Sequence, residues 1–600
     1  MQTGRIKLHD MKSSNEQKTG KLFTYLPYLI FFLASFLFFG LFADYICFYH
    51  EKSSLFIFSN DFLRENSRQP GALLLYIAKF LSSFYYYPAA GALIISAILC
   101  LIVYFASETV FIVTGRRSMI LPAIIGSAVL FLQTNYQYMH YNTLGMMLQL
   151  GFFCLTVRHL RGWLPVLLFP LWYYFAGGFV WIFLFLFSFY LLIDSFKKAC
   201  LKLIVTGLIY FIMLIIFKEF IFFQTLRTLL LFPMSNGSTG MQYKIFHPLV
   251  VVIILLPVLA RFINFFSGKI NSHRFIWSLT GNILLAGILS MILVFRFEPK
   301  YKQYFHAEKL FYEGKFNELI DYNTKKKSAN ILTSYLTNIA LCEIGQLNDR
   351  LLFFPQSPDG QTLFLKWGQN LAGEILRRGA YFYYTVGMIN EAQRWSFENM
   401  VIRGHTPEGL KLLIKTELIN GNYKMAEKYI SLMKRTLFYR KEAKVYEQLL
   451  SDEAINSDPE LGVKRKEKIK HDFFSITDDP FVNIELALAL DTLNRKAFDY
   501  KMAYMILRKD QHGIIRFLPW LEKYGYKKMP LHIEELAVAY RALNQGPFPR
   551  LEYLQPDPRT ELRFNQFLQT FQFYGNNLKV AEPFLRQKFS NTYWYWAFYK

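Results

Sequence analysis

The chain has few cysteines and lacks the motifs that mark common soluble enzymes. Its five cysteines lie far apart in 600 residues without a C-x-x-C spacing, which argues against a disulfide framework and a Cys-based zinc site. The motifs of P-loop nucleotide binding, zinc proteases, serine hydrolases and dinucleotide binding are also missing. ATP-driven and soluble hydrolase chemistry therefore have no support in the sequence.

Acidic residues are scarce in the first half. Residues 1–300 contain 24 Lys and Arg but only 10 Asp and Glu, around long apolar runs, whereas residues 301–600 contain 43 and 34. The first half is typical of a membrane domain and the second of a water-soluble one. The net charge of +23 is spread over both halves, so no nucleic-acid partner is expected. The short basic run Lys464-Arg465-Lys466 is interpreted as a solvated helix end or loop.

The apolar runs predict an all-α protein whose first half is a polytopic membrane domain, residues 22–296, after a basic leader, residues 1–21. Several runs are shorter than the roughly 20 residues of a simple crossing, and 164–193 alternatively forms one hairpin. About nine spans are expected, at residues 22–43, 89–106, 119–133, 144–157, 164–176, 179–193, 203–222, 249–265 and 275–294.

Basic residues predict the orientation of these spans. With a cytoplasmic N-terminus, fifteen Lys and Arg fall in the inner segments and seven in the outer ones. An odd number of spans then places residues 297–600 outside the cytoplasm. The expected localisation is a bacterial inner membrane, with the C-terminal domain in the periplasm.

Residues 297–600 read as consecutive amphipathic helices with an internal repeat. The segments that begin at Gly387 and Gly421 are 34 residues apart and carry alanines at matching positions, Ala392 and Ala426. This spacing is typical of tetratricopeptide repeats, so the sequence predicts a tetratricopeptide-like α-solenoid that binds a protein or glycan partner. Weaker echoes of the pattern contain Gly314, Gly345 and Gly575.

The aromatic C-terminus, residues 593–599, is expected to be a packed last helix. The alternatives are a partner surface and a segment that rests on the membrane.

An outer loop, residues 47–71, joins the first two spans and leads into an amphipathic helix at 71–87. That helix is expected to lie along the membrane surface, or alternatively to be an early start of the next span. The loop contains the run Ser59-Asn60-Asp61-Phe62-Leu63-Arg64.

This run and the order of span, outer loop and interfacial helix resemble the GT-C-type glycosyltransferases. The resemblance implies transfer of a sugar from a polyprenyl-phosphate carrier, at a lipid membrane, to an envelope glycan. Asp61 would then be the catalytic base. Many members of that family have two adjacent aspartates, and here the first is Asn60, which indicates a metal-independent variant or a fold without activity. No cofactor or metal is expected. The residues expected to neutralise the carrier phosphate are Arg64, Arg68, Arg227 and Lys244.

Other interpretations remain open. Asp61 alternatively caps a helix that starts at Phe62, and Glu51 and Glu65 are substitute bases. The whole chain also resembles bacterial multi-spanning membrane proteins of unknown function with helical-repeat tails, which is compatible with a non-enzymatic scaffold for envelope assembly. A transporter is the third hypothesis. The histidines on the predicted outer side are interpreted as belt residues rather than metal ligands: His50, His140 and His247.

Overall fold

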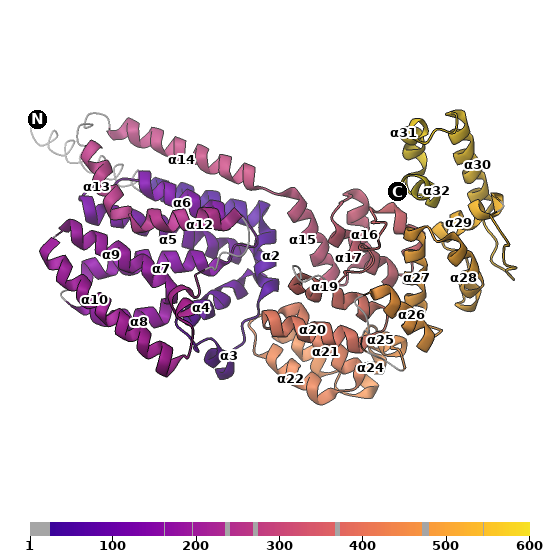
Figure 1. Ribbon diagram of the computed structural model, residues 1–600, viewed down its shortest axis with the longest axis horizontal. Helices are drawn as coiled ribbons and strands as arrows, with labels where there is room; N and C mark the ends of the chain where they lie inside the picture. The colour runs from indigo at the N-terminus through magenta and orange to yellow at the C-terminus, as the bar shows by residue number, and fades with distance from the viewer. Residues whose placement is uncertain are drawn as a thin grey trace, which may run out of the picture. The chain divides into compact units, whose positions relative to one another are not determined.

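The computed structural model describes residues 25–160, 163–194, 196–234, 241–267, 274–366, 372–470, 474, 479–543 and 545–600. Every regular element in these ranges is a helix, so the all-α prediction is confirmed. The chain divides into two compact units, Met1–Glu298 and Pro299–Lys600, and each is described by itself (Figure 1). The predicted leader, residues 1–21, lies outside the described residues.

The first unit is a bundle of apolar helices in which α5, α6 and α7 pack together. It begins with the helical segment Tyr25–Phe42, which ends in a short π-helix, η1. The elements of this unit are η1 (Phe38–Phe42), α2 (Asp44–Ser53), α3 (Asn60–Glu65), α4 (Ala72–Ser83), η2 (Phe84–Tyr86), α5 (Pro88–Thr114), α6 (Ile120–Gln133), α7 (His140–His159), α8 (Leu164–Ala176), η3 (Gly177–Phe179), α9 (Val180–Asp194), α10 (Phe196–Ile216), η4 (Phe217–Ile221), α11 (Leu226–Leu231), α12 (Met241–Ile254), α13 (Leu256–Ser267) and α14 (Arg274–Arg296).

Four helices among the described residues are long and apolar enough to cross a membrane: Tyr25–Phe42, Pro88–Thr114, Leu164–Ile193 and Cys200–Ile221. The count rises to six if two pairs of consecutive helices each form one span, Lys244–Ile254 with Leu256–Phe265 and Gly281–Arg296 with Pro299–Tyr312. The predicted number of nine is not confirmed. One reason is length, because α6 has only 14 residues.

The predicted amphipathic helix is a separate element. It corresponds to α4 and η2, and Tyr87 is extended before Pro88 begins α5. Proline suits this first helical position because its missing N–H would have no intrahelical partner. The segment is therefore not an early start of the next span.

Three distant segments of the first unit meet at Gly71. The Gly71 N–H donates to the Tyr174 carbonyl at 2.8 Å, and the Gly178 N–H donates to the Phe232 carbonyl at 2.6 Å. A Cβ atom at Gly71 would lie 2.4 Å from Pro233 Cδ, and Gly71 has a φ of +84°. Both features require glycine. The end of the outer loop is thereby fixed against η3 and the residues after α11.

The second unit consists of shorter helices joined by tight turns. Its elements are α15 (Pro299–Tyr312), α16 (Phe316–Lys325), α17 (Ile331–Glu343), α18 (Leu347–Arg350), η5 (Leu351–Phe353), α19 (Ala372–Thr385), α20 (Ile389–Arg403), α21 (Pro407–Asn420), α22 (Tyr423–Lys434), α23 (Arg440–Glu447), α24 (Asp452–Ser457), α25 (Leu461–Glu467), α26 (Pro480–Leu490), α27 (Arg495–Arg508), α28 (Gln511–Lys523), α29 (Leu531–Ala542), α30 (Pro558–Phe573), α31 (Leu578–Phe589) and α32 (Tyr593–Tyr599).

The two repeat segments form helix–turn–helix units. The helices α19 to α23 pack in chain order, each against the next (Figure 1). Gly387 and Gly421 occupy the turns with φ of +80° and +75°, a region open to glycine at little cost. Ala392 and Ala426 are fully buried on the second helix of each pair. The glycines of the weaker echoes, Gly314, Gly345 and Gly575, also have positive φ between two helices. This local geometry agrees with the predicted repeat, although an uninterrupted solenoid is not established.

The aromatic C-terminus forms the packed helix α32. Tyr593, Trp594, Tyr595 and Trp596 are all buried. The Trp594 indole N–H donates to the Glu535 carbonyl at 2.7 Å. The packed-helix interpretation is therefore confirmed.

Candidate functional site

The residue predicted as the base, Asp61, is exposed in the first turn of α3. The cap of this helix is Ser59, whose hydroxyl accepts a hydrogen bond from the Phe62 N–H at 3.1 Å. The interpretation of Asp61 as a cap at Phe62 is therefore wrong, because the helix begins one residue before Asp61. A carboxylate in the first turn still interacts favourably with the helix dipole.

The predicted phosphate-binding residues are also exposed. Arg64 and Arg68 follow Asp61 on and after α3, Arg227 lies on α11, and Lys244 lies on α12. Within the described part of the chain, no ion pair joins any of them to Asp61, and neither of the two cavities described here is lined by them. Their catalytic and binding roles stay predictions. Of the substitute bases, Glu51 is buried beside Lys52, 3.4 Å away, and Glu65 is exposed.

Two of the three outer histidines approach each other. The rings of His50 and His140 lie 6.4 Å and 5.6 Å from the ring of Tyr85. In the described ranges, no group of three or more His, Cys, Asp or Glu side chains is arranged to hold a metal ion.

The second unit contains a cavity of ≈ 810 Å³ with a mixed polar lining, which we call the central cavity. It lies among α15, α16, α17, α19, α21, α23 and α25. Aromatic rings and charges of both signs line it together, a combination enriched where proteins recognise partners. Its tyrosines are Tyr312, Tyr381, Tyr384 and Tyr446; its lysines are Lys315, Lys411, Lys415 and Lys464; and its glutamates are Glu313, Glu343, Glu408, Glu442 and Glu460.

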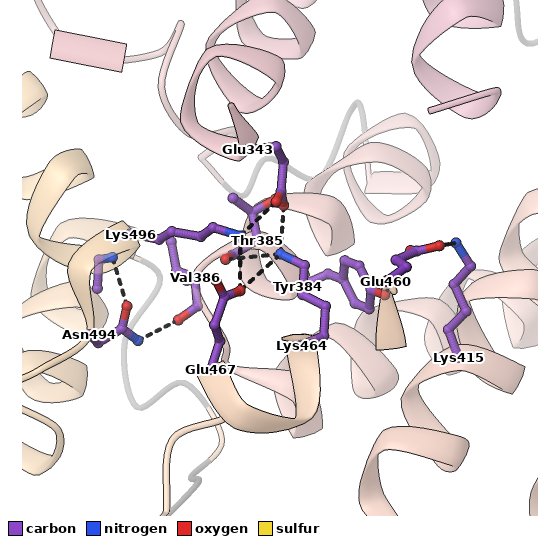
Figure 2. Close-up of polar contacts among 11 residues, drawn as sticks. Glu343, Tyr384, Thr385, Val386, Lys415, Glu460, Lys464, Glu467, Asn494 and Lys496 are labelled. Atoms are coloured by element: carbon purple, nitrogen blue, oxygen red, sulfur yellow. Dashed lines mark hydrogen bonds and ion pairs between the residues drawn. The ribbon is translucent and has the colours of Figure 1, made fainter. Parts of the chain in front are cut away.

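A four-residue lysine–glutamate cluster lies at one end of the central cavity. Lys464 Nζ is 2.6 Å from Glu343 Oε1, and Lys496 Nζ is 2.7 Å from Glu343 Oε2. Both ammonium groups also face Glu467 Oε2, at 3.5 Å and 2.9 Å. Figure 2 shows the two lysines reaching these carboxylates from different directions, and the residues come from α17, α25 and α27. Two positive and two negative charges balance, so the cluster fixes three helices without a net charge.

Burial and the lysines act in opposite directions on Glu343. Burial by itself would raise the pKa of this carboxyl, but the adjacent ammonium groups of Lys464 and Lys496 outweigh it and lower the pKa below its usual value. Glu343 is therefore ionised at neutral pH and serves as a fixed ion-pair partner rather than a proton donor.

A second polar chain leads from the cluster along the wall. The Lys464 ammonium lies 5.1 Å from the centre of the Tyr384 ring. The Tyr384 hydroxyl donates to Glu460 Oε1 at 3.0 Å, and Lys415 Nζ donates to the two oxygens of Glu460 at 2.6 Å and 2.8 Å (Figure 2). Burial and then Glu460 raise the pKa of Tyr384 well above its usual value, so the phenol stays protonated. The wall thus presents a neutral hydrogen-bonding ring and an accessible ion pair.

Sequence reasoning missed this cavity and misread one of its residues. Lys464 is only 5% exposed at its side chain, in contrast to the expected solvated helix end. Lys466 of the same run is exposed, and Arg465 is half-buried and paired with Asp452. The local sequence has no signal for the burial of Lys464, because its partner Glu343 comes from a helix 121 residues earlier.

Comparison with known proteins places nearly the whole chain in one family. Residues 19–600 match a family described as "Family of unknown function (DUF6057)". The chain belongs to this family. The match covers both units, so the apolar bundle and the helical unit with the central cavity occur together in it. No curated protein and no solved structure matches the chain.

Proposed function

We propose that this chain is a multi-span membrane scaffold that binds a polypeptide segment of a partner protein in the central cavity. The observation that carries the proposal is the lining of that cavity, in which tyrosines alternate with lysines and glutamates that are already held in ion pairs. A volume of ≈ 810 Å³ is within the usual range for a binding pocket.

The helical architecture supports a binding role. The glycine turns at Gly387 and Gly421 and the buried alanines after them are compatible with a tetratricopeptide-like array. Stacked helix pairs of this kind offer concave surfaces to extended partners.

A polypeptide fits the lining better than a neutral glycan does. Lysines and glutamates of both signs recognise charged side chains by electrostatic complementarity, whereas an uncharged sugar would only desolvate them. Lys411 illustrates the arrangement, because it contacts Glu408 at 3.3 Å and Glu442 at 2.9 Å. A partner segment with charges of both signs can exchange with these pairs without leaving a buried ion alone.

The membrane half supplies the anchorage in this proposal. We place the chain in a bacterial inner membrane with nine spans, a cytoplasmic N-terminus and the unit Pro299–Lys600 in the periplasm. A reporter that is active only in the periplasm, fused after Lys600, should be active. Activity of a cytoplasm-only reporter at the same position would refute this topology.

Photo-crosslinking in cells tests the binding role. A photoreactive amino acid at Glu442, which lines the central cavity, should give a discrete adduct with one protein, identified by mass spectrometry. The same amino acid at Lys424, exposed on α22 and outside the lining, is the matched control.

Charge reversal makes the experiment specific. Lys415→Glu should abolish the adduct, whereas Lys428→Glu, at an exposed position on α22, should leave it intact. Equal adducts from Glu442 and Lys424, or loss of the adduct in both reversal variants, would contradict a partner site in the cavity.

Glycosyl transfer is the second candidate. The separate helix formed by α4 and η2 after the outer loop, with Asp61 exposed on α3, agrees with the resemblance to GT-C-type enzymes. Cells without the protein should then lose an envelope glycan or accumulate its lipid-linked sugar donor. Complementation by the intact chain but not by Asp61→Asn, at equal protein levels, would support catalysis. Full complementation by Asp61→Asn would exclude Asp61 as the base.

A further inference from the structure

The first unit contains an acid–base cluster at the end of α5 that sequence reasoning did not identify. Glu108 lies on α5 with its side chain only 3% exposed, six residues before the helix ends at Thr114. One oxygen of its carboxylate is 3.2 Å from the Arg117 guanidinium, and the other pairs with Arg158. Charged groups within a membrane domain are costly and usually functional, which makes this cluster a candidate site.

The cluster carries one excess positive charge. Two arginines face one glutamate, and the side chains of Arg117 and Arg158 are 44% and 40% exposed although Glu108 is buried. Each guanidinium has five N–H donors, so pairing with Glu108 leaves donors that point away from it. Among the described residues, no other side chain pairs with Arg158. An anion with several oxygens can bind to both arginines at once.

A cavity with apolar walls starts beside this cluster. It has a volume of ≈ 490 Å³ between α5, α7 and α8, and both Glu108 and Arg158 line it. Its remaining wall is mainly aliphatic and aromatic, with Leu101 and Leu155 40% and 50% exposed on its open side. Trp172 forms part of the wall and stacks on Phe152, with ring centres 4.2 Å apart.

We infer that this cavity binds one acidic membrane phospholipid, with its phosphate on Arg158 and Arg117 and an acyl chain against the apolar wall. Charge complementarity supports the phosphate position, because one phosphodiester neutralises the excess positive charge. The open apolar wall supports the chain position, because it would otherwise face lipid without a fixed occupant. Basic pockets between membrane helices are a known physical solution for holding lipid head groups.

The site is separate from the residues predicted to bind a carrier phosphate. The helix α5 begins at Pro88, directly after η2, and Glu108 is twenty residues further along. At 1.5 Å per residue this is roughly 30 Å from the end of α5 that follows the outer loop. By the distribution of basic residues, Glu108 is at the inner end of the bundle.

Quenching of Trp172 by brominated lipid measures occupancy directly. The full-length protein is reconstituted in phosphatidylcholine with increasing fractions of phosphatidylglycerol that carries bromine on its acyl chains. The signal of Trp172 is the difference between the protein and its Trp172→Phe variant. Half-maximal quenching should occur at a small fraction of brominated phosphatidylglycerol, and brominated phosphatidylcholine should not reproduce it.

Two substitutions should act in opposite directions. Arg158→Gln removes one charge-assisted contact, so half-maximal quenching should need about tenfold more acidic lipid. Glu108→Gln raises the local charge by one unit and should require less acidic lipid than the unchanged protein. Arg116→Gln is the matched control, because Arg116 is exposed beside Arg117 and neither pairs with Glu108 nor lines the cavity.

The variants and the soluble competitor distinguish a bound lipid from misfolding, general surface attraction and a free phosphate compound. A gain in Glu108→Gln cannot come from misfolding, so opposite effects at Glu108 and Arg158 would support the site. Equal effects of Arg158→Gln and Arg116→Gln would reveal only general attraction of acidic lipid and would overturn the proposal. Glycerol phosphate, which has no acyl chain, should not relieve the quenching; relief would reassign the site to a free phosphate compound.

Discussion

Replacing Lys464 by Met should destabilise the second unit locally around α25. The lysine is 5% exposed and lies 2.6 Å from Glu343, so its removal breaks a buried ion pair. Breaking such a pair costs about 3 to 5 kcal/mol when the remaining charge is left alone. Here Lys496 still contacts Glu343 at 2.7 Å, which lowers the expected cost to about 2 to 3 kcal/mol.

Hydrogen exchange of the full-length protein in detergent measures this cost at the site. The amides of α25, Leu461–Glu467, should lose about 30- to 150-fold of their protection in Lys464→Met, since each 1.4 kcal/mol is a factor of ten. Lys415→Met is the matched control. Its partner Glu460 is 50% exposed, so the loss should be about 1 kcal/mol or less, a factor of five at most.

Two results would refute this reasoning. Equal effects of Lys464→Met and Lys415→Met would show that burial does not set the strength of these ion pairs. Additive effects of Lys464→Met and Glu343→Gln in the double variant would show that the two side chains do not interact, because contacting residues give a non-zero coupling energy.

Three further predictions concern stability of the second unit. Gly387→Ala should cost at least about 2 kcal/mol, since a Cβ would lie 2.3 Å from the Glu467 carbonyl, whereas Gly421→Ala should cost only the backbone strain of about 1 kcal/mol, as measured by hydrogen exchange of both turns. Trp594→Ala should cost about 3 to 5 kcal/mol and lower the thermal midpoint, because the ring is 1% exposed. Burial raises the pKa of Asp499 from 3.8 to about 6, so folding binds a proton in this window and stability falls by about 3 kcal/mol as pH rises through it. Asp499→Asn should remove this pH dependence of α27 protection; an unchanged profile would contradict it.

Features set by neighbouring residues could be predicted from the sequence. The apolar periodicity indicated helices, and the glycine at each repeat turn indicated the positive φ that the structure has at Gly387 and Gly421. The aromatic C-terminus has only apolar surface to bury, and it forms the packed helix α32. In each case the deciding interaction lies within a few residues or depends only on composition.

The number of spans was less predictable because hydropathy does not report where helices break. The segment 164–193 reads as two short apolar runs, but the structure treats Leu164–Ile193 as one candidate span with Gly177 inside it. The helix α7 has 20 residues but carries the buried polar side chains of Asn142, Thr143 and Gln149. Such a helix needs protein neighbours on its polar side, and those neighbours are not visible in its own sequence.

The same limit explains why the charged sites were missed. Glu108 is one carboxylate at the end of an apolar run, and its partner Arg158 is 50 residues away. Lys464 is one lysine of a basic run, and its partner Glu343 is 121 residues away. A charge is recognised as buried only when its partner is known, because an unpaired ion would not be tolerated there. The residues that sequence reasoning favoured, led by Asp61, were conspicuous because they lay in polar loops, and for the same reason they are exposed. In this chain, paired charges inside helices are therefore the stronger guide to where ligands bind.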